Sequence, residues 1–378
     1  LDSRPIPRWR AEDLDPRVYA LSRASQHLLA HVGAWSRIAE TRAAPYLRMR
    51  VWEGADAYAA NALDFDSADI GEPDLGHIVE DALLRTVLAD RLAASREAQL
   101  VIGAEIESVA ASEREIAVAL KDGGSLRGAV LLAADGSDST VRRLRGLPVA
   151  GHGYGQNAVV THVTSTRGHQ STAWQRFLPG GPLALLPLAD GRSSIVWSLP
   201  TLDAERLLAA SDAEFLAELG AASLGCVGEL TACSKRVAFP LQALHALKYT
   251  APRVALLGDA AHTVHPLAGQ GMNLGILDAA SIAAVVEDAL IAGEDIGDLK
   301  VLRRYERQRK GDNLAMLAAF DGLNRLFRLP SWAAPMRELG LRAVESAAPV
   351  KRVLMQKALG LEAGRRLEVR WSRAELQA

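Results

Sequence analysis

Short apolar runs alternate along the chain with longer stretches in which apolar residues recur at helical spacing. Five runs in the first third of the chain are bounded by glycine, aspartate and other polar residues, which is the pattern of strands. They cover residues 49–52, 62–65, 99–106, 116–120 and 125–132. The cluster Asp122-Gly123-Gly124 predicts a tight hairpin between the last two of these strands.

Helical spacing predicts two helices in the same third, one over residues 22–32 and one that is entered through 75–81 and ends near residue 94. In the middle of the chain the runs become shorter and are separated by Gly, Pro and Asp turns, which favours an antiparallel sheet. Its strands are predicted at 157–164, 171–177, 183–187, 193–199 and 235–239, with a helix at 212–224. Trp174, Phe177 and Trp197 are expected to pack in the core rather than to line a pocket.

One unit late in the chain joins a strand, a carboxylate, glycines and a long helix. Residues 253–273 read RVALLGDAAHTVHPLAGQGMN, and their apolar start has the composition of a buried parallel strand. The strand ends in Gly258-Asp259, and a Gly-Gln-Gly turn leads into a helix at 272–292. Ligands of open α/β sheets bind beyond the carboxyl ends of the strands, and the first N–H groups of a helix carry partial positive charge. We therefore expect Asp259 to bind a polyhydroxylated group and the helix start to face an electron-rich one.

A second unit repeats this order of residues. The run at 125–132 leads into AADGSDSTVR, residues 133–142, where Asp135 and Gly136 follow the apolar strand. We expect Arg142 to tie this loop down through charge-assisted hydrogen bonds.

Composition narrows the class of protein. The chain has 378 residues, enough for two domains, and a formal net charge of -2 that gives no reason to expect nucleic-acid binding. The two cysteines, Cys226 and Cys233, have no metal or redox spacing and are expected to be buried free thiols in a reducing compartment. We therefore expect a cytoplasmic protein, and no apolar run reaches the length of a membrane span.

The usual signatures of protein-borne catalysis are absent from the sequence. There is no G-x-S-x-G elbow and no phosphate-binding G-x-x-x-x-G-K-S/T loop. His262 and His265 stand three apart, but no carboxylate or cysteine group completes a metal site, so no metal is expected. We can name no catalytic residue, and the reactive atom is expected to belong to a cofactor.

The string GDAAH, then Pro, then AGQGMN resembles the second flavin-contacting motif of the class A flavoprotein aromatic hydroxylases, in the form found in ubiquinone-biosynthesis hydroxylases. By this resemblance FAD is the cofactor and NAD(P)H the reductant, and O2 is used to hydroxylate a polyprenyl phenol. The resemblance implies an α/β fold, with a Rossmann-like FAD-binding domain, an antiparallel-sheet substrate domain like that of p-hydroxybenzoate hydroxylase, and C-terminal helices.

The resemblance also implies roles for individual residues. Asp259 would bond the ribityl chain of FAD, and Pro266 would face the reaction zone. The pyrimidine edge of the flavin would be met by Gly269, Gln270, Gly271, Met272 and Asn273. Arg17 would contact the phosphates or ribose, and Arg85 would reach the cofactor. The remaining cofactor candidates are Asp2, Asp135 and Gly136.

One part of the family pattern is missing at the start of the chain. A dinucleotide-binding fold opens with a strand, a G-x-G-x-x-G turn and a helix, followed about 20 residues later by an acid that binds the ribose. The chain begins at Leu1-Asp2, and Asp2 stands where that acid would fall. We therefore expect about 30 residues, either cut or disordered, to be missing, which a mass measurement would decide.

The expected domains are discontinuous. The FAD-binding domain is predicted to comprise 1–48, 76–148 and 252–315, the substrate domain 49–75 and 149–251, and a C-terminal helical region 316–378. A basic run in the helix predicted at 302–317 is expected to be a solvated face; it comprises Arg303, Arg304, Arg307, Arg309 and Lys310.

The tail at 320–361 mixes apolar with basic residues, and two interpretations stay open. It fits a peripheral contact with the inner membrane or a biosynthetic complex, and equally helices packed on the flavin domain. Two other functions also stay open: a flavin hydroxylase of a soluble aromatic substrate, or a non-catalytic, cofactor-less member of a biosynthetic complex.

Overall fold

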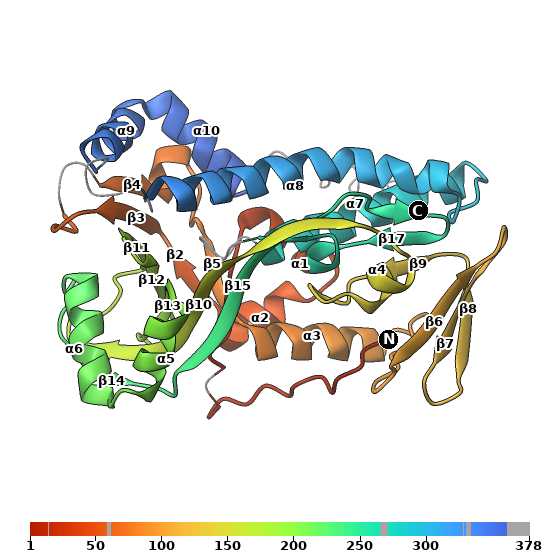
Figure 1. Cartoon of the computed structure of the whole chain (residues 1–378), viewed down its shortest axis with the longest axis horizontal. Helices are drawn as coiled ribbons and strands as arrows, with labels where there is room; N and C mark the ends of the chain where they lie inside the picture. Colours follow the sequence, from red (N-terminus) through yellow and green to blue (C-terminus); the bar gives the residue numbers. More distant parts are fainter. Residues whose placement is uncertain (14, 59–61, 265–270, 328, 330–333, 361–378) are drawn as a thin grey trace.

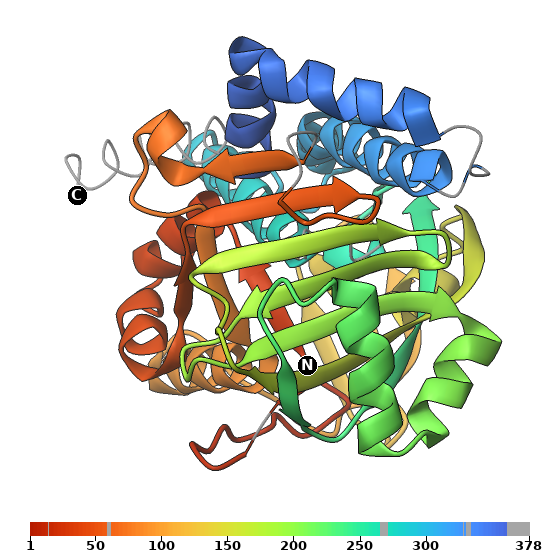
Figure 2. The same cartoon turned by 90° about the vertical axis from the view of Figure 1, so that its left-hand side faces the viewer.

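The computed structural model describes residues 1–13, 15–58, 62–264, 271–327, 329 and 334–360. Its largest layer is a nine-stranded sheet with the order β18-β15-β10-β13-β12-β11-β3-β4, in which β14 also pairs with β10 (Figures 1 and 2). The strands are β3 (Arg48–Glu53), β4 (Leu63–Asp66), β10 (Val149–Ser165), β11 (Thr172–Leu178), β12 (Gly181–Pro187), β13 (Ser193–Pro200), β14 (Leu230–Cys233), β15 (Val237–Ala246) and β18 (His262–Thr263). All neighbours are antiparallel except β3 and β11, which run parallel, so the expected antiparallel pattern is wrong at this one pair.

Alternation along β10 gives this sheet two different faces. Val159 and Val163 are fully buried and belong to a core that includes residues of α5 (Thr201–Ala209) and α6 (Asp212–Ser223). Figure 2 shows these two helices, in green, in front of the sheet. Trp174 and Trp197 pack in the same core, as predicted. Ala158 and Val160 point to the opposite face, where they pack in a separate apolar cluster.

A second, smaller sheet has the order β16-β17-β9. In it β17 (Val254–Leu256) runs parallel to β9 (Leu131–Ala133) and antiparallel to β16 (Thr250–Ala251). The sheet shares a buried core with α4 (Thr140–Leu144), α7 (Gly271–Ile291) and α8 (Leu299–Phe327). Figure 1 shows α8 extending along α7 over the upper side of the molecule.

The remaining elements surround these two sheets. One small sheet has the order β1-β5-β2, formed by β1 (Val18–Leu21), β5 (Gly76–Glu80) and β2 (Ala44–Tyr46). Another is the meander of β6 (Ile106–Ala111), β7 (Ile116–Leu120) and β8 (Ser125–Gly128), which projects from one end of the molecule in Figure 1. The other helices are α1 (Arg23–His31), α2 (Trp35–Arg42), α3 (Asp81–Ala94), α9 (Ala334–Ser346), α10 (Ala348–Ala358) and the short η1 (Ser67–Ile70) and η2 (Gly258–Ala260).

Several predicted boundaries need correction. The strand expected at 99–106 reduces to a single parallel bridge between Asp2 and Ile102, and β6 begins only at Ile106. The strand expected at 125–132 is two strands, β8 and β9, in different sheets. The strand expected at 157–164 is the longer β10, which has 17 residues. The strand β5 and the helix α5 are additions that the sequence did not predict.

The C-terminal helices dock on the outer strands of the large sheet. Arg337 of α9 is 4% exposed and makes two hydrogen bonds from Nε to the Glu53 carboxylate of β3, at 2.8 and 3.0 Å. The Phe327 ring at the end of α8 stacks on Phe177 of β11, with ring centroids 3.7 Å apart. One continuous α8 passes through the boundary predicted between 315 and 316. Among the described residues, no helix is long and apolar enough to cross a membrane.

Candidate functional site

The two strands that end in carboxylates are parallel neighbours. Leu256 of β17 lies opposite Ala133 of β9, so Asp259 and Asp135 emerge at the same edge of the small sheet. A guanidinium joins the two loops, because Arg142 donates from one nitrogen to the carbonyl of Ala260 at 2.8 Å and from another to that of Ser137 at 2.6 Å. The prediction that Arg142 ties down its loop is confirmed. Both units therefore present their polar ends side by side.

Both carboxylate oxygens of Asp135 accept hydrogen bonds from within its own loop. One carboxylate oxygen accepts from the Ser139 hydroxyl at 2.5 Å, and the other accepts from the N–H of Val141 at 3.0 Å. Gly136 has a φ of +83°, a left-handed conformation that a side chain rarely adopts. Asp135 and Gly136 thus form a rigid turn at the edge of the sheet.

The turn that carries Asp259 requires glycine at two places. Gly258 has a φ of +54°, and a Cβ built on Gly275 of α7 would lie 3.3 Å from the Gly258 Cα. The two backbones therefore approach so closely that side chains are disfavoured. Helix α7 packs directly against the turn after β17.

Asp259 has an accessible carboxyl group in crowded surroundings. Its side chain is exposed, and no hydrogen bond within the described ranges reaches its carboxylate. Protein around it nevertheless limits its hydration and raises the pKa above the ordinary Asp value, while His262 and Arg17 pull the pKa the other way. The Arg17 guanidinium also lies 4.7 Å from the centre of the Phe239 ring. Arg17 therefore lies close enough to Asp259 to attract its carboxylate.

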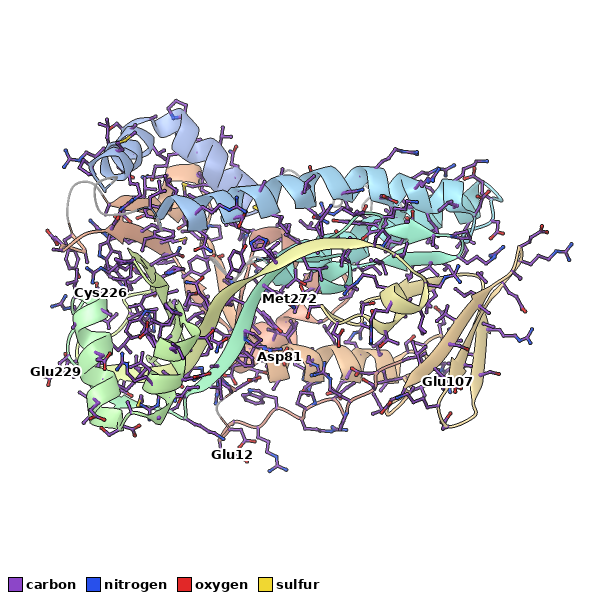
Figure 3. All side chains as sticks on the ribbon, viewed as in Figure 1. Glu12, Asp81, Glu107, Cys226, Glu229 and Met272 are labelled. Atoms are coloured by element: carbon purple, nitrogen blue, oxygen red, sulfur yellow. The ribbon has the colours of Figure 1, made fainter. Side chains whose placement is uncertain are left out.

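The start of α7 is anchored by a buried amide. The Asn273 carbonyl oxygen accepts from the Ser22 N–H at 2.9 Å and the Ser25 hydroxyl at 2.8 Å, and its amide donates to the Ala20 carbonyl at 2.9 Å. This side chain therefore fixes the helix start against β1 and the beginning of α1. Figure 3 shows Met272 in the central part of the molecule.

Gly271 is the first residue of α7, and Met272 packs beside an apolar cluster that includes Leu21 and Val79. The other three candidates from this motif, Pro266, Gly269 and Gln270, lie outside the described residues.

The two remaining candidates form one ion pair. Asp2 lies in the parallel bridge with Ile102, and its carboxylate is 3.4 Å from a guanidinium nitrogen of Arg85 on α3. Both side chains keep about a third of their surface accessible. Arg85 is therefore a partly exposed residue that pairs with Asp2.

A buried polar cluster, which the sequence does not predict, lies behind the Asp259 turn. Asp278 of α7 is fully buried and bonds His262, Arg309 and Asn313. Arg309 was expected on a solvated face, and this is wrong for that residue, which is 6% exposed. The available signal was the spacing of Tyr305, Arg309 and Asn313, which places three polar groups on one face of α8. Arg303 and Arg307 are exposed, as predicted.

This arrangement suits a large, polyhydroxylated and partly anionic ligand. An accessible carboxylate can accept hydrogen bonds from hydroxyl groups, and a nearby guanidinium can pair with phosphate. The first turn of the 21-residue helix α7 adds partial positive charge. The residues present at this edge thus fit the FAD that the motif resemblance implies.

Comparison with known proteins agrees with an FAD-binding site. Residues 2–316 match a family described as FAD binding domain. The chain is 35% identical over 361 residues to the Escherichia coli 3-demethoxyubiquinol 3-hydroxylase, covering 95% of this chain and 91% of that protein. It is 35% identical to the human ubiquinone biosynthesis monooxygenase COQ6, with 91% and 82% covered.

A solved structure supports the fold. Pseudomonas aeruginosa PqsL in complex with 2-aminobenzoylacetate matches with a TM-score of 0.71 and 24% identity, over 88% of this chain and 90% of that one. At this identity the similarity concerns the fold alone.

Proposed function

Because this chain belongs to the class A FAD-dependent aromatic hydroxylases, in the family of the ubiquinone-biosynthesis hydroxylases, we propose that it hydroxylates the ring of a polyprenyl phenol in ubiquinone biosynthesis. The protein is an FAD-dependent monooxygenase. The observation that carries the choice of substrate is the 35% identity, over 95% of the chain, to a protein named for a ubiquinol ring hydroxylation. One oxygen atom of O2 would enter the ring and the other would leave as water, while NAD(P)H is oxidised.

We propose that the edge formed by β9 and β17 holds FAD. Asp259 would accept hydrogen bonds from the ribityl hydroxyls, and Arg17 would contact the phosphates or ribose. The backbone at the start of α7 would meet the pyrimidine edge, and Asp2 with Arg85 would lie toward the ribose. When bound, FAD supplies the redox chemistry that connects NAD(P)H oxidation with oxygen transfer.

The task of the protein's own residues would be to orient the ring and to exclude water. An apolar cluster on the second face of the large sheet, formed around Ala158, Val160 and Leu241, lies beside Phe239. The Arg17 guanidinium covers the Phe239 ring, so this face adjoins the proposed cofactor residues. Partly buried members of this cluster, among them Tyr154, Val196 and Phe239, would offer an apolar wall to a prenylated phenol.

We also propose a cytoplasmic location with peripheral contact at the inner membrane. Met336 and Leu339 of α9 are 71% and 69% exposed, and Val353 of α10 is 51% exposed. The basic residues Arg342 and Arg352 of the same helices are exposed as well. Exposed apolar side chains among basic ones suit the surface of an anionic bilayer, from which a polyprenyl substrate would be drawn.

A tail-dependence assay tests the proposed substrate. Purified protein would be supplied with FAD, NAD(P)H and isotope-labelled O2, and offered either a polyprenyl phenol in detergent or the same phenol without its tail. The expected product is the tailed phenol carrying one labelled oxygen, with at most about a tenth of that rate on the tail-less phenol. Faster hydroxylation of the tail-less phenol would favour the soluble-substrate alternative. Absence of both products with FAD bound would favour the non-catalytic one.

A further inference from the structure

A fully buried carboxylate lies directly behind the turn that carries Asp259. Asp278 projects from α7 and has no solvent exposure. Its Oδ2 accepts a hydrogen bond from the backbone N–H of Gly258 at 3.1 Å and lies 2.5 Å from Nε2 of His262. A single carboxylate oxygen therefore holds both ends of the turn 258–262.

The second oxygen of Asp278 faces α8. It accepts from Nε of Arg309 at 2.8 Å and from the side-chain amide of Asn313 at 3.1 Å. Arg309 also donates to the amide oxygen of Asn313 at 2.8 Å, and both side chains are buried. All four bonds to Asp278 therefore come from two places, the turn and one face of α8.

The charges in this cluster are balanced. Burial alone would raise the pKa of Asp278, but the hydrogen bond with His262 and the attraction of Arg309 outweigh it and hold the pKa below the ordinary Asp value. Asp278 is therefore ionised at neutral pH. Removing one partner of a buried ionised group strongly destabilises the folded protein. The folded state therefore favours this one arrangement of the side chains.

Helix α8 holds the turn on both sides. The Tyr305 hydroxyl donates to the carbonyl of Leu256, the last residue of β17, at 2.8 Å. Tyr305, Arg309 and Asn313 recur every four residues and so share one face of α8. The strand before the turn and the carboxylate behind it are both fixed from this face.

We propose that Asp278 is a positioning residue for the cofactor: held by α8, it fixes the turn that aims the Asp259 carboxylate and so determines FAD affinity through that turn. The inference rests on the role proposed above for Asp259. It gives α8 a part in cofactor binding through the turn that Asp278 holds.

A double-mutant cycle separates this role from a general loss of structure. FAD dissociation constants would be measured by flavin fluorescence for the purified protein and for Asp259→Asn, Asp278→Asn and the double variant. Thermal unfolding without FAD would be recorded in parallel. Asp278→Asn is expected to weaken FAD binding about tenfold in the parent protein and less than about twofold in the Asp259→Asn background.

Each other outcome of the cycle overturns the proposal. Equal weakening in both backgrounds would mean that Asp278 acts through general stability rather than through Asp259. Unchanged affinity in Asp278→Asn would remove it from cofactor binding altogether. If Asp259→Asn itself leaves affinity unchanged, the proposed role of Asp259 fails and this inference fails with it.

A milder pair of variants decides the matter if Asp278→Asn does not fold. Asn313→Ala removes one neutral donor to Asp278 and leaves both charges in place, and a loss of about fivefold in FAD affinity is expected. The matched control is Asn324→Ala, a buried asparagine of the same helix that lies about 16 Å further along it. The control should leave FAD affinity unchanged, and an equal loss in both variants would contradict the proposal.

Discussion

A carboxylate binds a ligand most readily where its oxygens are accessible and accept few hydrogen bonds from the protein. At the edge of the small sheet, Asp135 accepts from its own loop with both oxygens, and Asp278 accepts from the turn and from α8. Asp259 alone among these three receives no side-chain hydrogen bond from the described residues and stays accessible. Asp135 thus stabilises its own loop, Asp278 fixes the turn to α8, and Asp259 remains accessible to a ligand.

The buried His162 makes the stability of the protein depend on pH. His162 of β10 is 2% exposed, and neither ring nitrogen has a hydrogen-bond partner among the described residues. Burial lowers its pKa from the ordinary 6.5 to about 4, and Arg192 and Arg42 act in the same direction. Between these values the unfolded chain takes up a proton that the folded protein does not. The stability due to this difference is therefore lost as the pH falls from 6.5 to 4.

Replacement of His162 should reduce this pH dependence. His162→Gln stays neutral at every pH, so its loss of unfolding free energy between pH 7 and pH 5 should be smaller than that of the parent protein by about 2 kcal/mol. Urea unfolding at the two pH values measures this difference. Equal losses in the variant and the parent would show that His162 is protonated in the folded protein.

Asp278 illustrates what single residues in the sequence could not reveal. The motif around Gly258-Asp259 was recognisable because its residues are contiguous, whereas the partners of Asp278 come from residues 258, 262, 309 and 313. Charges on a helix indicate a solvated face unless another polar group is known to lie opposite, and only the packing of α7 on α8 supplies that group.

At the scale of elements, the joint between β17 and α7 depends on two glycines. A Cβ on Gly275 would approach the Gly258 Cα to 3.3 Å, and Gly258 is fixed in a left-handed conformation. Alanine normally stabilises a helix interior by up to about 1 kcal/mol over glycine. Here the atom met is a backbone Cα in a turn that Asp278 holds, so we expect the clash to outweigh that gain.

Gly275→Ala should therefore lower the free energy of unfolding by about 1 kcal/mol, since overpacking costs more than helix propensity returns. Gly311→Ala on α8 is the control, because a Cβ there would meet no atom within 4 Å. The control should instead raise the unfolding free energy slightly. Denaturant unfolding of the two variants measures both, and a stabilising Gly275→Ala would contradict the tight packing of α7 on the turn.

Buried strands bounded by turns were predictable, and elements fixed by tertiary contacts were not. The runs that became β7, β12 and β17 lie within a residue or two of their predicted bounds because they are buried and end in turns. The sequence predicts Gly76–Glu80, which forms β5, as the approach to α3, since it joins that helix without a turn residue. The length of β10 could not be foreseen, because its first half is exposed and glycine-rich and pairs only through β15.

At the scale of the whole molecule, the C-terminal helices are both docked and exposed. The contacts of Arg337 with Glu53 and of Phe327 with Phe177 hold them on the large sheet. The tail therefore packs on the protein, but these contacts are with residues assigned to the predicted substrate domain rather than to the flavin domain. Apolar side chains on α9 and α10 nevertheless remain exposed. Docking on the sheet and contact with a membrane are thus compatible.

A truncation near Asp321 would remove the buried Phe327 and is a poor test of membrane contact.

Substitution of exposed residues tests membrane contact without loss of packing. The triple variant Met336→Ser, Leu339→Ser and Val353→Ser should reduce binding to vesicles of phosphatidylcholine and phosphatidylglycerol by about tenfold or more, because each apolar side chain buried in lipid contributes about 1.5 kcal/mol or more. Leu202→Ser is the control, since Leu202 of α5 is 78% exposed on another part of the molecule. Co-sedimentation measures both, and unchanged binding of the triple variant would exclude the tail as the membrane contact.

Titration of the purified protein with FAD, followed by visible absorption and flavin fluorescence, tests the proposed cofactor site directly. We expect saturable binding of one FAD per chain with a protein-perturbed flavin spectrum, and binding weaker by about tenfold in Asp259→Asn, which loses a charged acceptor. A protein that leaves the flavin spectrum unchanged at saturating FAD, or an Asp259→Asn variant that binds FAD as tightly as the parent, would contradict the proposed site.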